Sequence, residues 1–149
     1  MSLLNDYKDS LIFEIQKEFW NERGKGARHR LSLVGVDILR KILKDPSDIN
    51  EIMELFKKEG LCAEITMTDN EFSVVLNIKD CTFLKVRDSF MDKNQQPLSC
   101  PLGNAIMNAM DLKSGMAPEL LPIVREGANC CKVELAKMSN AAVVGGPSQ

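Results

Sequence analysis

The first third of the chain repeats its apolar residues at the spacing of an α-helix. Between Leu3 and Arg23, apolar side chains recur every three or four residues while acidic and basic side chains take the other faces. The glycines in the break from Arg23 to Gly26 end this pattern. The sequence therefore predicts an amphipathic helix, whose apolar positions are Leu4, Leu11, Ile12, Ile15, Phe19 and Trp20.

Two more helical patterns follow. The first runs from Ala27 to Lys44 and contains Gly35, where glycine costs about 1 kcal/mol relative to alanine unless another backbone approaches closely. The second is capped by Ser47 or Asp48 and continues to Lys58. The positions expected to face inward are Leu31, Val34, Ile38, Leu39 and Ile42 in the first, and Ile49, Ile52, Met53 and Phe56 in the second.

The period then changes from that of a helix to the alternation of a β-strand. The segments 61–68 and 71–79 alternate apolar and polar residues around a turn at Asp69 and Asn70, which predicts a β-hairpin. A short helix is expected within 82–92, and a longer one from Ser99-Cys100-Pro101 to Gly115, because proline suits the first helical position. Two further strands are expected near 120–125 and 129–138.

Helices first and strands later, rather than strict alternation, are typical of the α+β class. We predict an antiparallel sheet of about four strands packed against the N-terminal helices and one inserted helix. Residues 1–138 are expected to form a single domain, with 1–26 as helix and turn and 61–138 as the half that contains the sheet. Residues 139–149 are small, with glycine and proline, and predict a flexible tail.

Charge and hydropathy restrict the class of partner. A net charge of -2 in 149 residues argues against a general nucleic-acid binder, which needs a basic face. No apolar run approaches the roughly 18 residues of a membrane span. The first residues lack the order of a secretory signal, so a cytoplasmic protein is expected. The glycines near Lys25 lack the order of a phosphate loop, so no nucleotide is expected.

The cysteines are the candidates for chemistry. Five cysteines without an export signal argue against a disulfide framework. Cys100 lies at a predicted helix start, where a thiolate is stabilised, but a cysteine nucleophile also needs a histidine base. The only histidine is His29, in a basic stretch far along the chain from Cys100.

A metal site needs ligands that converge in space, whatever their order in the chain. Cys81 leaves the first hairpin, Cys100 opens a helix, and Cys130 and Cys131 lie on the last strand, where they point to opposite faces. A carboxylate such as Glu126 or Glu119 could complete such a site. From spacing alone, buried structural thiols are the better interpretation.

Three motifs in the C-terminal half of the chain resemble those of a known family. They are Ile78 to Cys81, Ser99-Cys100-Pro101 continuing to Ile106, and Ile123 to Leu135, in which a glycine is followed by three residues and then Cys131. Together they resemble the vinyl-4-reductase-type domain family. The resemblance implies an α/β domain that binds small molecules or hydrocarbons, related in fold to vesicle-tethering (TRAPP) subunits and haem-based nitric-oxide sensors.

Family members that sense aromatic compounds bind zinc through cysteines that match Cys100 and Cys131, with a glutamate and a further cysteine between them. Here no cysteine stands in Glu119–Ile123, so Cys81 is the expected third ligand. Glu126, Cys130 or water is expected in the fourth position, with water or a bound ligand favoured. The resemblance thus implies that Cys100 and Cys131 share one coordination shell. No haem is expected, because His29 lies outside the matched region.

The leading hypothesis is a regulatory domain without catalysis that binds an apolar small molecule and signals through a homodimer or a separate protein. An assembly protein is the second hypothesis, for which an exposed apolar stripe in the N-terminal third would be the evidence. Phe13, Phe19 and Trp20 are its candidates, with at least two of them expected in the core. A reductase-related enzyme ranks third.

Overall fold

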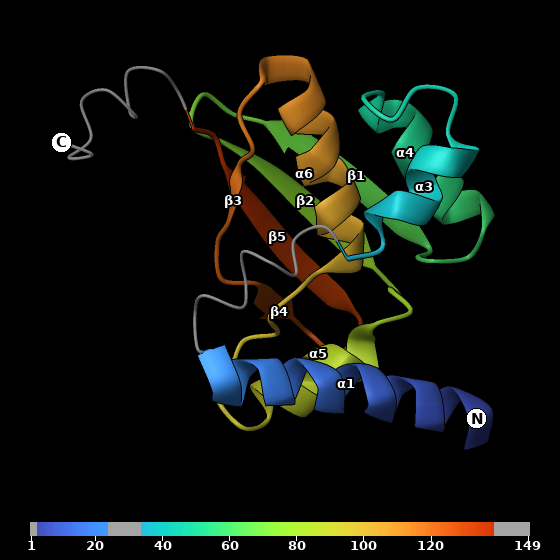
Figure 1. Ribbon diagram of the computed structural model, residues 1–149, viewed down its shortest axis with the longest axis vertical. Coiled ribbons are helices and arrows are strands. Elements are labelled where there is room, and N and C mark those ends of the chain that lie inside the picture. Colours follow the sequence, from blue (N-terminus) through green and yellow to red (C-terminus); the bar gives the residue numbers. More distant parts are fainter. Residues whose placement is uncertain (1–2, 24–33, 139–149) are drawn as a thin grey trace, which may run out of the picture.

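A computed structural model gives the structure of the chain and describes residues 3–23 and 34–138. These residues form five helices and a five-stranded antiparallel sheet, which confirms the predicted α+β class (Figure 1). The predicted tail at 139–149 and the predicted helical residues 27–33 lie outside the described residues. The helices are α1 (Leu3–Arg23), α3 (Val36–Ile42), α4 (Ile49–Lys58), α5 (Leu84–Met91) and α6 (Pro101–Ser114).

The strands are β1 (Glu64–Asp69), β2 (Ser73–Lys79), β3 (Glu119–Leu120), β4 (Val124–Glu126) and β5 (Cys130–Ala136). β5 lies in the middle of the sheet. β2 pairs with one side of β5, and β3 and β4 pair with successive parts of its other side. We expected about four strands. The difference arises because Pro122, which has no N–H to donate, separates the expected strand at 120–125 into two short pieces.

The core lies between the sheet and α6. Alternate residues of β2 and β5 point toward this helix, and their register pairs Leu76 with Val133 and Ile78 with Cys131. α6 is buried along most of its length, and α4 adds Ile52 and Phe56, as the sequence predicted. Each such buried aliphatic or aromatic side chain contributes about 1.5–3 kcal/mol to the free energy of unfolding.

The predicted helix ends are confirmed at two places. The Asp48 side chain caps α4 by accepting from the Glu51 N–H at 3.2 Å. Cys100 caps α6, with Pro101 directly after it. The helix expected from Ala27 to Lys44 is different: its described part begins only at Val36. Gly35 has a φ of 87°, and no atom of the described residues lies within 4 Å of a would-be Cβ, so among these residues it provides a positive φ rather than a close approach.

Two helices turn a different face to the core than their periodicity indicated. In α3, Val36 is buried and Leu39 packs against the core as predicted, whereas Ile38 and Ile42, and Val34 just before the helix, are exposed. In α1, which packs across one end of the molecule against α5, the protein-facing side includes Phe13 and the buried Gln16 (Figure 1). The exposed apolar residues of α1 are Leu3, Leu4, Tyr7, Leu11, Ile15 and Phe19.

Candidate functional site

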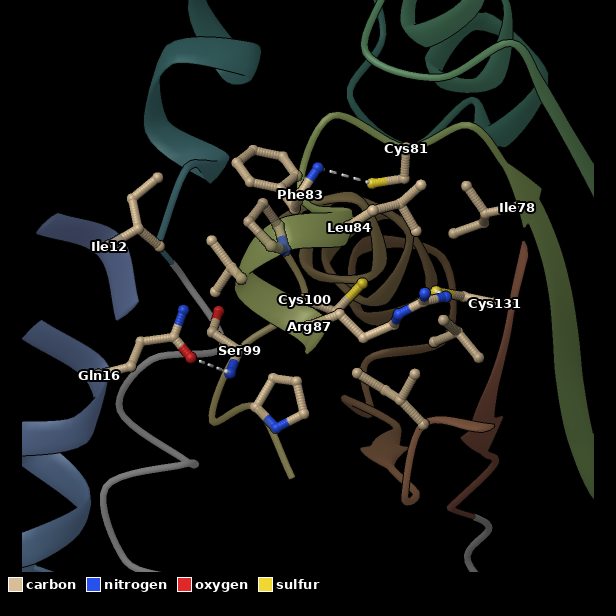
Figure 2. Close-up of a pocket in the computed structure, with 15 residues that line it drawn as sticks. Ile12, Gln16, Ile78, Cys81, Phe83, Leu84, Arg87, Ser99, Cys100 and Cys131 are labelled. Carbon is tan, nitrogen blue, oxygen red and sulfur yellow. Dashed lines mark hydrogen bonds between the residues drawn. The ribbon is translucent and has the colours of Figure 1, made fainter. Parts of the chain in front are cut away.

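A mostly apolar pocket lies where α1, the N-terminal ends of α5 and α6, and strands β2 and β5 meet (Figure 2). The pocket is partly open to solvent, and about 40 Å³ of it admits the centre of a water-sized sphere. One water needs about 10–15 Å³ on this measure, so the pocket holds a few water-sized units. Ile12, Leu84, Ile123 and Val133 are among its walls.

Three thiols line this one pocket: Cys81, Cys100 and Cys131. The Cys81 sulfur, just after β2, accepts from the Phe83 N–H at 3.4 Å. Cys131 lies on the inward face of β5, in register with Ile78 of β2. Figure 2 shows the three side chains, which come from three separate segments of the chain, with the Cys81 sulfur turned toward the Phe83 N–H.

The third thiol, Cys100, lies at the N-terminus of α6 and accepts from the Gly103 N–H at 3.4 Å. A Cβ added at Gly103 would lie 3.3 Å from the Cys100 Sγ. The glycine of this motif therefore allows the thiol to lie against the helix. The position of the sulfur is thus fixed by the local sequence.

Burial keeps two of these thiols protonated. It raises the pKa of Cys81 to about 12, against a smaller lowering by the hydrogen bond from the Phe83 N–H. Burial also raises the pKa of Cys131, although the hydrogen bond from Arg87 acts in the opposite direction. At neutral pH both side chains are therefore thiols, which behave as small hydrophobic groups.

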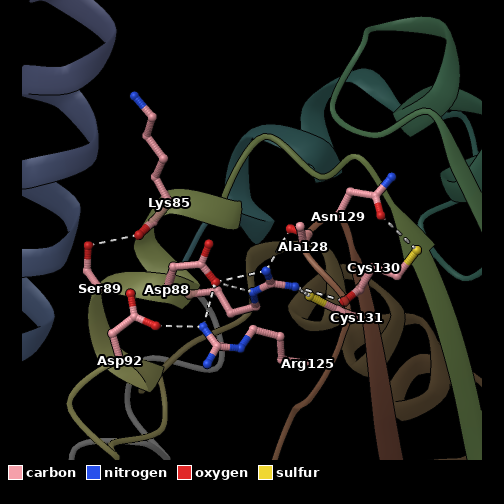
Figure 3. Close-up of polar contacts among 10 residues, drawn as sticks. Lys85, Asp88, Ser89, Asp92, Arg125, Ala128, Asn129, Cys130 and Cys131 are labelled. Atoms are coloured by element: carbon pink, nitrogen blue, oxygen red, sulfur yellow. Dashed lines mark hydrogen bonds and ion pairs between the residues drawn. The ribbon is translucent and has the colours of Figure 1, made fainter.

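Arg87 is the charged side chain at this pocket, and it is only 4% exposed. The Nη1 of Arg87 donates to the Cys130 carbonyl at 2.8 Å and to the Cys131 Sγ at 3.2 Å. Nη2 donates to the Ala128 carbonyl at 2.9 Å and contacts the Asp88 carboxylate at 2.8 Å, to which Nε also donates at 2.9 Å (Figure 3). These four hydrogen bonds and one ion pair engage all three nitrogens of the guanidinium.

The same arginine connects α5 to the hairpin between β4 and β5. On the outer side, Arg125 of β4 contacts Asp88 at 3.2 Å and Asp92 at 2.8 Å (Figure 3). Because Asp88 and Arg125 are more than a third exposed, this outer part contributes less than the buried contacts of Arg87. The network holds one wall of the pocket in place.

Gln16 fixes α1 over the pocket. Its Oε1 accepts from the Leu98 N–H at 2.9 Å and from the Ser99 N–H at 3.3 Å, both buried contacts. Phe13 packs edge-to-face on Phe90, with ring centroids 4.7 Å apart. Gln16 and Arg87 were not among the residues singled out from the sequence. Gln16 shares a helical face with Ile12 and Trp20, a signal that could have found it, but no pattern marks Arg87.

The structure brings Cys81, Cys100 and Cys131 to one pocket but not Glu126, which is exposed on β4 opposite Cys130. Among the described residues, no three His, Cys, Asp or Glu side chains are arranged to hold a metal ion. The guanidinium of Arg87 against Cys131 opposes a cation at this thiol. As arranged, these residues do not fit a zinc ion, and the zinc site stays a prediction from the sequence.

No family model, curated protein or solved structure matches the chain. The vinyl-4-reductase resemblance therefore stays a prediction that rests on short motifs. Within the part of the chain that the structure describes, no helix has the length and apolar character needed to cross a membrane.

Proposed function

We propose that this domain binds a small, uncharged, apolar molecule in the pocket lined by Cys81, Cys100 and Cys131, and that it acts as a regulatory binding domain. The observation that carries the proposal is that all three guanidinium nitrogens of Arg87 are already engaged in contacts with the protein, through four hydrogen bonds and an ion pair. A carboxylate ligand would have to displace one of these buried contacts. The rest of the described wall is mostly hydrophobic, so an apolar ligand fits it better than an anion.

Binding rather than catalysis is favoured by the chemistry of the described wall. Its residues include neither a histidine nor a carboxylate that could take a proton from a thiol. The pKa values of Cys81 and Cys131 are both raised, so neither is a thiolate at neutral pH. The family resemblance implies the same class of ligand, and a reductase-related activity ranks behind it.

The test compares two probes of similar shape, toluene and benzoate, by thermal unfolding and by titration calorimetry on the full chain. We expect toluene to bind and to raise the melting temperature, by the equivalent of about 1.4 kcal/mol at tenfold over its Kd. We expect benzoate to do neither. Binding of benzoate with no binding of toluene or other small apolar probes would overturn the proposal.

A pair of substitutions localises the binding. Leu84 is half-buried and lines the pocket, so Leu84→Trp is expected to fill it from the rim and abolish toluene binding. Leu112 on α6 is 55% exposed and does not line the pocket, so Leu112→Trp is the matched control and is expected to bind normally. Equal toluene binding by both variants would place the ligand elsewhere.

A further inference from the structure

Helix α1 places a polar side chain, Gln16, in the wall of the pocket. Gln16 is only 6% exposed and lies one helical turn after Ile12, which also lines the pocket. Its Oε1 accepts from two backbone N–H groups, that of Leu98 at 2.9 Å and that of Ser99 at 3.3 Å. Because a backbone N–H can only donate, the amide oxygen must face these two groups and the amide nitrogen must face the other way.

The nitrogen of this amide has no acceptor among the described residues. The hydrogen bonds that Gln16 forms with them, from Leu98 and Ser99, both go to its oxygen. Figure 2 shows the oxygen at the Ser99 N–H and the nitrogen on the other side of the amide. Buried amide nitrogens normally have acceptors, because unpaired N–H groups away from water are costly. Gln16 therefore holds a donor at the pocket for an acceptor that the described residues do not supply.

We propose that the guest of this pocket is a small carbonyl compound, whose neutral oxygen accepts from the Nε2 of Gln16 while its hydrocarbon part contacts the apolar wall. This inference rests on the proposed function, since it names the class of molecule that the same pocket binds. It adds a requirement that an apolar wall alone would not impose. The guest must carry an oxygen acceptor at the end that faces α1.

The polar groups at the pocket favour an acceptor without charge. An amide N–H donates and cannot accept, so it matches a carbonyl oxygen rather than an ammonium or another N–H group. A single neutral donor does not offset the desolvation of a carboxylate, and the charge of Arg87 is already engaged with the protein. A pure hydrocarbon would displace water from the Nε2 of Gln16 and leave it unpaired. A carbonyl compound avoids both costs.

The test compares three probes of nearly equal shape on the full chain by titration calorimetry. Cyclohexanone carries the carbonyl, methylenecyclohexane replaces its oxygen by a methylene group, and cyclohexanol can donate as well as accept. Gln16→Glu keeps an oxygen for the Leu98 and Ser99 N–H groups, which favour its ionised form, but replaces the free donor by an acceptor. Ser10 is exposed on the same helix and outside the pocket wall, so Ser10→Glu is the matched control for the added charge.

We expect Gln16→Glu to weaken cyclohexanone about tenfold or more relative to methylenecyclohexane, because two acceptors would then face each other. The affinity of cyclohexanol relative to methylenecyclohexane should stay near its wild-type value, because a hydroxyl can donate to the carboxylate. Ser10→Glu should leave both ratios unchanged. If Gln16→Glu changes all three affinities equally, the carbonyl inference is wrong and the apolar pocket stands. If neither these probes nor toluene bind the wild type, the proposed function itself is wrong.

A measurement on the wild type decides the matter if Gln16→Glu does not fold. The side-chain amide protons of Gln16 are followed by nuclear magnetic resonance on the isotope-labelled chain. We expect them to move downfield when cyclohexanone binds, as protons do when they enter a hydrogen bond, and to move less with methylenecyclohexane. Equal displacements by the two probes would overturn the inference.

Discussion

The Nη1 of Arg87 lies 3.2 Å from the Sγ of Cys131, and both side chains are more than nine-tenths buried. A cation is therefore held against a thiol at a mostly apolar pocket. The guanidinium is tolerated there because two backbone carbonyls and a carboxylate complete its contacts. The same contacts join α5 to the last hairpin, so Arg87 both places a positive charge at the pocket and holds these two elements together.

Replacing Arg87 should be costly. Arg87→Met removes the buried charge and leaves the Ala128 and Cys130 carbonyls without this donor, so we expect a loss of about 2–4 kcal/mol in the free energy of unfolding. Arg125→Met, at a side chain that is 38% exposed, is the matched control and should cost under about 1 kcal/mol. Urea unfolding of both variants checks this, and equal losses would contradict it.

Stability should decline at alkaline pH. An unfolded cysteine has a pKa of about 8.5, whereas Cys81 in the folded chain has a pKa raised to about 12, and that of Cys131 is also raised. The protonated thiols are favoured by the fold, so their contribution is complete below about pH 8.5. It is lost as the pH rises toward 12, by up to about 1.4 kcal/mol per pH unit for each thiol.

Urea midpoints between pH 7 and pH 11 measure this decline. Cys81→Ala should make the decline shallower above pH 9, because it removes one of the three thiols whose pKa burial raises, the third being Cys62. Cys130 is half-exposed and outside the pocket wall, so Cys130→Ala is the control and should leave the slope unchanged. A wild-type midpoint that stays constant to pH 11 would show that the thiols are not desolvated.

Gly103→Ala should destabilise the chain although it lies inside a helix. Alanine would gain about 1 kcal/mol from helix propensity, but its Cβ would lie 3.3 Å from the Cys100 Sγ and 3.4 Å from the Cys100 Cβ. We expect crowding to exceed the gain, for a net loss of about 1 kcal/mol. A double-mutant cycle with Cys100→Ala measures the coupling energy between the two positions. The loss caused by Gly103→Ala should be smaller in the Cys100→Ala background than in the wild type. Additive effects would refute the contact as the cause.

Gln16→Leu should loosen α1. It leaves the buried N–H groups of Leu98 and Ser99 without their shared acceptor, at a cost of about 1–3 kcal/mol. Gln16→Glu keeps an oxygen at the same place and serves as the control. Limited proteolysis should cleave near α1 faster in Gln16→Leu than in the wild type, and equal rates in all three proteins would contradict the assignment.

The order and type of the elements could be predicted because local signals agree with the fold. Asp48, the Cys100-Pro101 start of α6, and the alternation of Cys131 and Val133 each specify their element through contacts within a few residues. The face of α1 could not be predicted in this way. It is apolar on two sides, and only its packing against α5 decides that Phe13 faces inward while Leu11 does not.

Of the residues that line the pocket, only the cysteines were singled out from the sequence. Spacing and resemblance selected Cys81, Cys100 and Cys131, and these three do share one wall. Glu126 was expected beside them, but its strand position turns it to solvent opposite Cys130. The sequence did not predict a role for Arg87 at the pocket, because the partners of its guanidinium on the segment from Ala128 to Cys131 lie more than forty residues away in the chain.

The two sides of α1 have a consequence for signalling. Ile12 and Gln16 line the pocket, while their immediate neighbours Leu11 and Ile15 face outward. Since a helix turns as a rigid rod, an axial rotation that widens the pocket also reorients the outer row that contains Leu11 and Ile15. Binding of any protein to the outer row is then thermodynamically linked to occupancy of the pocket. Whatever factor a guest molecule changes in the affinity for such a protein, that protein must change in the affinity for the guest.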